Sequence, residues 1–163
     1  MEKTRLKTSA LTKIGVIAAL YIVITLLVAP WSFGAVQLRF GEMLNHLAVF
    51  NKRYIWALTI GCAIVNLFSP LGIIDIIFGT LGTLVMTTLS YYLSRRLKSV
   101  TAKLATSTLI CTVAMWSVAL ELHLISKVPF WPTYLSVALG ELLSLVIGAI
   151  LFYVLAKRID LTA

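Results

Sequence analysis

The chain has 163 residues, of which 60% are hydrophobic and only 12% are charged, and its net charge is +8. Soluble domains carry about 25% charged residues, so this composition excludes an ordinary soluble protein. The positive charge does not indicate nucleic-acid binding, because the basic residues form short clusters beside apolar stretches, where such residues set topology and contact anionic lipid.

The apolar stretches predict an all-α integral membrane protein, a compact bundle of six transmembrane helices in a single domain (1–163). The expected spans, in chain order, are residues 14–30, 33–50, 54–68, 73–93, 104–124 and 131–156. The first is well supported, because 25 uncharged residues separate Lys13 from Arg39, enough to cross a core of about 30 Å. Its length, and the five stretches that follow it, argue against a cleaved signal peptide.

The second span is short. Only 12 residues separate Arg39 from Lys52, about 18 Å of α-helix. Starting the span at Phe33 restores a full crossing but places Arg39 and Glu42 within it. A crossing is still favoured, because without it most basic loops would lie outside the cell. Ionisable groups at that depth are costly and usually functional.

The basic residues are divided between the two sides of this topology. Loops with many basic residues stay in the cytoplasm, so both termini are expected to be cytoplasmic. Only Arg39 and Lys127 fall on the outer side, and the other twelve on the inner side are Lys3, Arg5, Lys7, Lys13, Lys52, Arg53, Arg95, Arg96, Lys98, Lys103, Lys157 and Arg158. The acids Glu42, Asp75 and Glu121 lie near outer ends of spans, which predicts a polar site open to the outside.

Each candidate site residue also has a structural interpretation. Glu42 and His46 are four residues apart, on one face of an α-helix with Asn45 beside them, but Glu42 could simply pair with Arg39. A metal site would need a third ligand, which His123 could supply only through the tertiary fold. No metal or other cofactor is expected.

Further candidates follow along the chain. Asp75, in the first turn of the fourth span, is favoured there by the helix dipole whatever its function, and Asn66 lies across the turn at 69–72. Glu121 ends the fifth span. Glu141 lies about 15 Å down the last helix, where a carboxylate must be protonated, paired or facing water. Trp116 could stack on a ligand or simply pack.

Small residues mark one face of the first span. Gly15 and Ala19 are four apart with Ala18 beside them, a spacing that allows close approach of another helix, from this bundle or from a partner subunit. The chain has no P-loop, G-x-S-x-G, HExxH or CxxC motif, so neither ATP binding by that route nor enzymatic catalysis is expected.

Two segments carry a family resemblance. Residues 32–42 (SFGAVQLRFGE) and residues 75–83 (DIIFGTLGT), together with Gly140-Glu141, resemble the signatures of QueT-type proteins. These are the queuosine-precursor substrate-binding subunits (S components) of energy-coupling-factor transporters. The chain departs from the family pattern at Gly41, where a serine is usual, and at Gly15, where an alanine is usual.

The resemblance implies a multi-pass protein of the bacterial cell membrane that binds a 7-deazaguanine from outside. It also implies docking, through Gly15, Ala18 and Ala19, on a transmembrane coupling subunit that carries two ATPase subunits. Glu42 or Glu141 would take the guanine edge, and the other expected site residues are Asp75, Asn66, Arg39, Asn45 and Glu121, with Trp31, Phe33 or Trp116 as a flat wall. The alternatives are an S component for another small metabolite, a self-sufficient carrier, and an intramembrane metalloenzyme.

Overall fold

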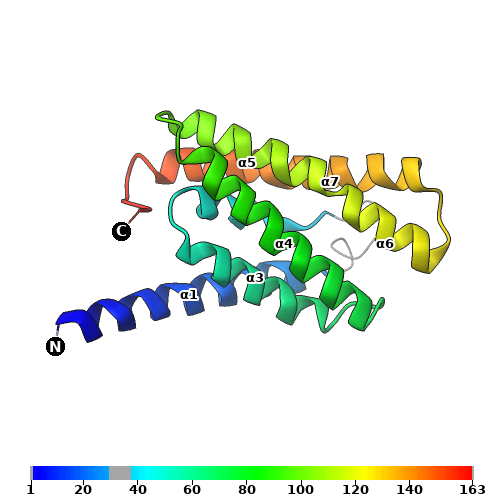
Figure 1. Ribbon diagram of the computed structural model, residues 1–163, viewed down its shortest axis with the longest axis horizontal. Helices are drawn as coiled ribbons and strands as arrows, with labels where there is room; N and C mark the ends of the chain where they lie inside the picture. Colours follow the sequence, from blue (N-terminus) through cyan, green and yellow to red (C-terminus); the bar gives the residue numbers. More distant parts are fainter. Residues whose placement is uncertain (1, 30–37, 163) are drawn as a thin grey trace.

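The computed structural model describes residues 2–29 and 38–162, and this part of the chain is helical without strands. Apart from α6, which continues α5, successive elements run in alternating directions between the two ends of an elongated bundle, and the start of α1 and the end of α7 lie at the same end (Figure 1). The elements are α1 (Glu2–Leu27), the 3₁₀ helix η1 (Phe40–Val49), α3 (Arg53–Asn66), α4 (Ile73–Ser94), α5 (Val100–Ala114), α6 (Trp116–Ser126) and α7 (Phe130–Leu155).

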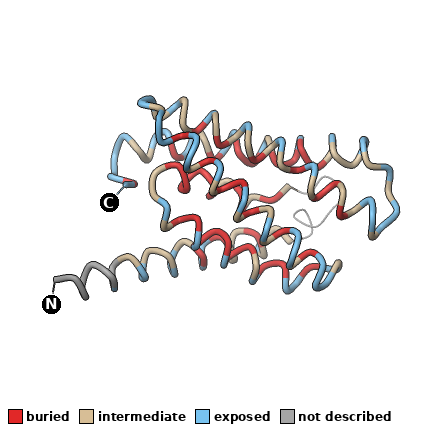
Figure 2. The backbone as a smooth tube through the Cα atoms, in the orientation of Figure 1, coloured by how far each residue is buried: buried red, intermediate tan, exposed pale blue. Residues whose placement is uncertain are grey.

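Four helical stretches are long and apolar enough to cross a membrane. They are Ala10–Leu27, Ile73–Ser94, Val100–Ser126 (α5 with α6) and Phe130–Leu155. Their outward positions carry many exposed Leu, Ile and Val side chains, while the buried positions gather on the inside of the bundle (Figure 2). The all-α membrane class is therefore confirmed, whereas the number of crossings and the side of the termini stay predictions.

The second expected span is not an α-helix. Its described part is η1, a ten-residue 3₁₀ helix in which eight residues are buried, and η1 contacts α1, α3, α4, α5 and α7. Runs of 3₁₀ helix longer than three or four residues are uncommon and often mark a functional segment. A 3₁₀ helix rises about 2.0 Å per residue, so these ten residues extend about 20 Å. The segment therefore extends further than an α-helix with the same number of residues would.

Two other spans differ from their expected form. α3 has 14 residues, about 21 Å of helix, and ends two residues before the expected boundary. The fifth span is divided at Met115 into α5 and α6, and the Ser117 hydroxyl donates a hydrogen bond of 2.9 Å to the Ala114 carbonyl across this break. A side chain that bonds the helix backbone in this way is a common cause of a kink. The turn before α4 is as expected: Gly72 has φ 67°, which suits glycine, and its N–H bonds the Ser69 carbonyl at 3.2 Å.

Close contact between α7 and η1 depends on Gly148. A Cβ added there would lie 2.8 Å from the Met43 carbonyl oxygen and 3.0 Å from its Cα. We expect Gly148→Ala to lower the free energy of unfolding by about 1–3 kcal/mol, because backbone atoms would have to move. Gly82→Ala is the matched control, since its nearest atom would be the Ser117 hydroxyl oxygen at 3.7 Å. Thermal unfolding in detergent measures both, and equal melting temperatures would contradict the prediction.

Candidate functional site

The polar site is centred on Arg39, which immediately precedes η1. Its side chain is buried, and it is the only buried Lys or Arg among the residues whose side chains the structure describes, which leave out Lys3, Arg5 and Lys7. The guanidinium forms an ion pair of 3.9 Å with the carboxylate of Asp75 on α4. It also interacts electrostatically with three further carboxyl groups, those of Glu42, Glu121 and Glu141. Acids on four separate elements thus lie within electrostatic range of one base, and Asp75 contacts it.

Glu42 is held by two side-chain donors. The Tyr21 hydroxyl of α1 donates a hydrogen bond of 2.6 Å to Oε1, and the Asn45 amide donates to Oε2. Asn45 reaches Glu42 because residues three apart eclipse in a 3₁₀ helix. The prediction that His46 lies beside Glu42 assumed α-helical spacing. It was wrong because this segment is a 3₁₀ helix. His46 instead lies toward α7, with its Nε2 2.9 Å from the Leu145 carbonyl oxygen.

Gly41 brings η1 close to α1. A Cβ at this position would collide with the Thr25 hydroxyl and lie 3.2 Å from the Tyr21 carbonyl oxygen. The absence of a side chain lets η1 approach near enough for the Tyr21 hydroxyl to reach Glu42. Gly41 therefore has a structural role in the α1–η1 contact.

Asn66 and Asp75 lie together, as their positions across the turn suggested. The Asn66 amide donates to the backbone carbonyl of Asp75 at 3.0 Å and to the Cys62 sulfur at 3.4 Å. Gly79 provides the space, because a Cβ there would collide with the Asn66 amide. Asn66 thus ties α3 to the first turn of α4 and positions Asp75 opposite Arg39.

Glu121 on α6 and Glu141 on α7 lack hydrogen-bond donors of the kind that hold Glu42. Each side chain is at most 1% exposed. None of their four carboxyl oxygens has a hydrogen-bond partner within residues 2–29 and 38–162. A buried carboxylate without donors is costly, so both groups are poised to accept donors from a ligand, or else hold protons.

A small cavity lies beside Arg39 and Glu42. It holds about 10 Å³, the space of one water molecule, and Phe78, Thr83, Met86 and Val118 are among the residues of α4 and α6 that line it. A planar base would need far more room, so ligand binding at this position requires α4 and the α5–α6 junction to separate.

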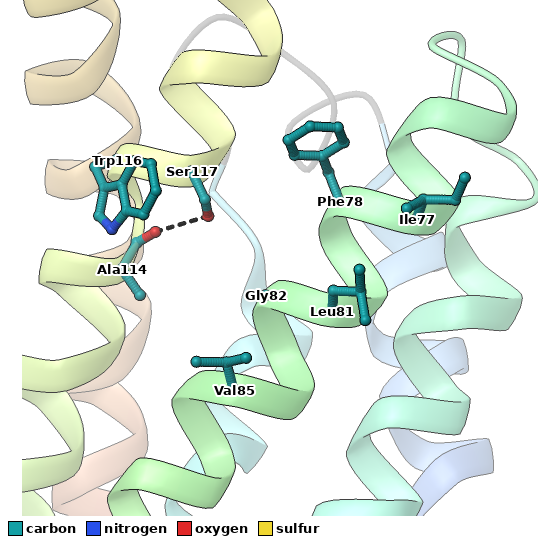
Figure 3. Close-up of a pocket in the computed structure, with 8 residues that line it drawn as sticks. All are labelled: Ile77, Phe78, Leu81, Gly82, Val85, Ala114, Trp116 and Ser117. Atoms are coloured by element: carbon teal, nitrogen blue, oxygen red, sulfur yellow. Dashed lines mark hydrogen bonds between the residues drawn. The ribbon is translucent and has the colours of Figure 1, made fainter.

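A larger groove of about 350 Å³ lies on the surface of the bundle and adjoins this small cavity. Side chains of α4 line one wall, and those of the α5–α6 junction line the other (Figure 3). Trp116 belongs to this apolar groove and is exposed, so it lies outside the polar cavity. The groove and the cavity share Phe78, Gly82, Ala114 and Ser117.

Sequence reasoning missed two side chains of the site. Tyr21 precedes Glu42 by 21 residues, and no spacing rule connects them. Phe78 could have been found, because it follows Asp75 by three residues on α4 and so shares its face. It is the aromatic ring at the cavity, whereas Trp31 and Phe33 lie outside the described residues.

The histidines do not gather with the acids. His123 is exposed, with Nδ1 2.6 Å from the Val128 carbonyl oxygen, and His46 contacts α7. Within the part of the chain that the structure describes, no group of three or more His, Cys, Asp or Glu side chains could hold a metal ion.

The small residues of α1 divide between two surroundings. Ala18 is buried in the bundle, while Gly15 and Ala19 are exposed. Among the described residues, a Cβ at Gly15 would meet no atom of another element within 4 Å. These two exposed positions therefore leave a shallow, apolar part of α1 open to a neighbour.

An apolar helical protein with charged side chains gathered inside it has the architecture of a multi-pass membrane protein that handles a polar solute. The family model of the QueT transporter matches residues 11–157. The Queuosine precursor transporter QueT of Lactococcus lactis subsp. cremoris (strain MG1363) is 38% identical over 165 residues, covering 96% of this chain and 97% of the relative. No solved structure matches the chain significantly. The chain belongs to the QueT transporter family, a family of cell-membrane transporters and not of enzymes.

Proposed function

We propose that the protein is the substrate-binding subunit of an energy-coupling-factor importer and binds a 7-deazaguanine queuosine precursor from outside the cell. The observation that carries this proposal is a group of buried carboxyls that lack hydrogen-bond donors among the described residues, those of Asp75, Glu121 and Glu141. Asp75 also forms an ion pair of 3.9 Å with Arg39. The name of the Lactococcus relative supports the substrate class.

The guanine edge offers adjacent ring N–H and amino donors, which one carboxylate can accept in a two-pronged bond. Both oxygens of Glu42 already accept bonds from Tyr21 and Asn45, whereas both oxygens of Glu141 lack partners within the described residues. We therefore assign the guanine edge to Glu141, with Phe78 as a stacking surface. Glu42, Asp75, Asn45 and Asn66 hold the surrounding polar framework.

The topology of the proposal has six crossings with both termini in the cytoplasm. The junctions of η1 with α3 and of α4 with α5, and the end of α7, all lie at the end where α1 starts (Figure 1). These three places, with the first turns of α3 and α5, carry eight of the 14 basic residues: Lys52, Arg53, Arg95, Arg96, Lys98, Lys103, Lys157 and Arg158. By the positive-inside rule this end is cytoplasmic. The first turn of α4, with Asp75, then lies toward the outside.

Energy comes from partner subunits in this proposal, because the sequence has no P-loop of its own. The protein docks through the exposed Gly15 and Ala19 on a coupling subunit that carries two ATPases. Reconstituted alone in liposomes, it should bind a 7-deazaguanine without accumulating it, and ATP-driven uptake should require the coupling module. Accumulation by the isolated protein would favour the self-sufficient carrier instead.

A bulky side chain at Gly15 tests the docking surface. Gly15→Leu should leave ligand affinity unchanged, because no atom of another described element lies within 4 Å of a Cβ there. It should reduce ATP-driven uptake about tenfold by keeping the partner helix away. Leu143→Trp, which adds bulk to an exposed position of α7, is the control and should transport normally. Equal uptake by both variants would argue against docking at Gly15.

A further inference from the structure

A basic pocket of about 430 Å³ lies where α5 begins and α7 ends, at the end of the bundle where α1 starts (Figure 1). Its bases come from two elements: Lys103 from the first turn of α5, and Lys157 and Arg158 from the residues just after α7. The acid that lines it is Asp160, whose Oδ1 accepts hydrogen bonds from the N–H and the hydroxyl of Thr162. Three cations against one acid make the pocket suitable for an anion.

An apolar groove of about 380 Å³ continues from this pocket between α5 and α7. Its walls include Leu104, Ala105 and Thr108 of α5, and Ala149, Ile150 and Tyr153 of α7. The pocket and the α5–α7 groove meet at Tyr153, because the Lys157 ammonium lies 4.2 Å from the centre of the Tyr153 ring. Both helices belong to stretches that are long and apolar enough to cross a membrane, so the groove lies open to lipid.

Charge and apolar surface follow one another in the same order along both helices. On α5, the groove residue Thr108 comes five residues after Lys103, which is about 7.5 Å deeper in the bundle. On α7, Ala149 lies six residues before the end of the helix, about 9 Å from it. Val100, the first residue of α5, also lines the pocket, and the N-terminus of a helix favours an anion. A phosphate at the end of the bundle with an acyl chain directed inward would match this order.

We propose that the junction of α5 and α7 binds an anionic phospholipid of the cytoplasmic leaflet. Lys103, Lys157 and Arg158 hold its phosphate, and one acyl chain lies in the α5–α7 groove. Basic pockets between membrane helices on the cytoplasmic side are suited to anionic headgroups, and the positive-inside rule places this end of the bundle there. Another pocket with two bases, Arg95 and Arg96, is lined by the end of α4 alone and does not join two helices.

The first test needs no variant. Purified full-length protein in detergent is titrated with three compounds, and native mass spectrometry measures each complex. Phosphatidylglycerol should bind at least tenfold more tightly than phosphatidylcholine with the same acyl chains, because its headgroup carries a net negative charge. Glycerophosphoglycerol, the same headgroup without chains, should bind at least tenfold more weakly than phosphatidylglycerol, since it leaves the groove empty. Equal binding of the two lipids would overturn the proposal, and equally tight binding of the chain-free headgroup would overturn it in favour of a soluble phosphate ester.

A pair of double variants locates the headgroup. Lys103→Gln with Lys157→Gln should weaken binding of phosphatidylglycerol at least tenfold, because two cations are lost from the pocket. Arg95→Gln with Arg96→Gln removes the same charge from the end of α4 and should bind within about twofold of the unaltered protein. Melting temperatures in lipid-free detergent show that both variants are folded. Equal weakening would mean that overall charge attracts the lipid, and would overturn the site.

A bulky side chain tests the acyl chain. Ala105→Trp fills the α5–α7 groove without changing the charge, and should weaken binding of phosphatidylglycerol about tenfold. Leu151→Trp, at an exposed position of α7 outside the groove, is the control and should bind normally. Equal affinities of these two variants would overturn the placement of a chain between α5 and α7.

Discussion

Replacing Glu141 with glutamine should weaken binding of a 7-deazaguanine queuosine precursor by about 10- to 100-fold. The variant keeps the size of the side chain but loses the charge and the second acceptor of a two-pronged bond, which is an effect of about 1.5–3 kcal/mol. Equilibrium titration of the purified protein measures it. Asp160→Asn is the matched control, since Asp160 is an exposed acid near the end of the chain.

The same variant should gain thermal stability when no ligand is present. The oxygens of Glu141 are buried without donors in the described residues, so neutralising the group removes a cost of folding. If Glu141 binds the ligand, its replacement lowers affinity and raises the melting temperature of the ligand-free protein. Unchanged affinity with a lower melting temperature would show that Glu141 is structural.

Replacing Arg39 with glutamine should lower the free energy of unfolding by about 3–5 kcal/mol. The variant leaves Asp75 and its neighbours without their cation, and breaking a buried ion pair from one side is strongly destabilising. Thermal unfolding in detergent should show a lower melting temperature. Lys127→Gln, which removes an exposed base from the same expected side, is the control and should change little.

A double variant separates the ion pair from other roles of Arg39. Arg39→Gln combined with Asp75→Asn should recover part of the lost stability, because the stranded carboxylate is gone. A double variant no more stable than Arg39→Gln alone would show that the 3.9 Å contact between these side chains contributes little.

The sequence by itself predicted the features that depend on local composition. The apolar stretches gave α4 and α7 to within a residue or two of their ends, because lipid-exposed helices are uniformly apolar and stop at Gly, Pro or charge. It also identified all four buried acids, since a carboxyl group inside an apolar stretch is conspicuous whatever its neighbours are. Motif resemblance predicted the QueT family, and the comparisons confirmed it.

Only the tertiary structure decided how these residues are arranged. The 3₁₀ form of η1 results from packing against five other elements, and no helical period in the sequence indicates it. That form turns His46 toward α7 and pairs Glu42 with Asn45. Arg39 pairs with Asp75, and Tyr21 reaches Glu42. Both contacts join segments that are distant in the chain. Local spacing carries no information about such contacts, because they form only when helices pack side by side.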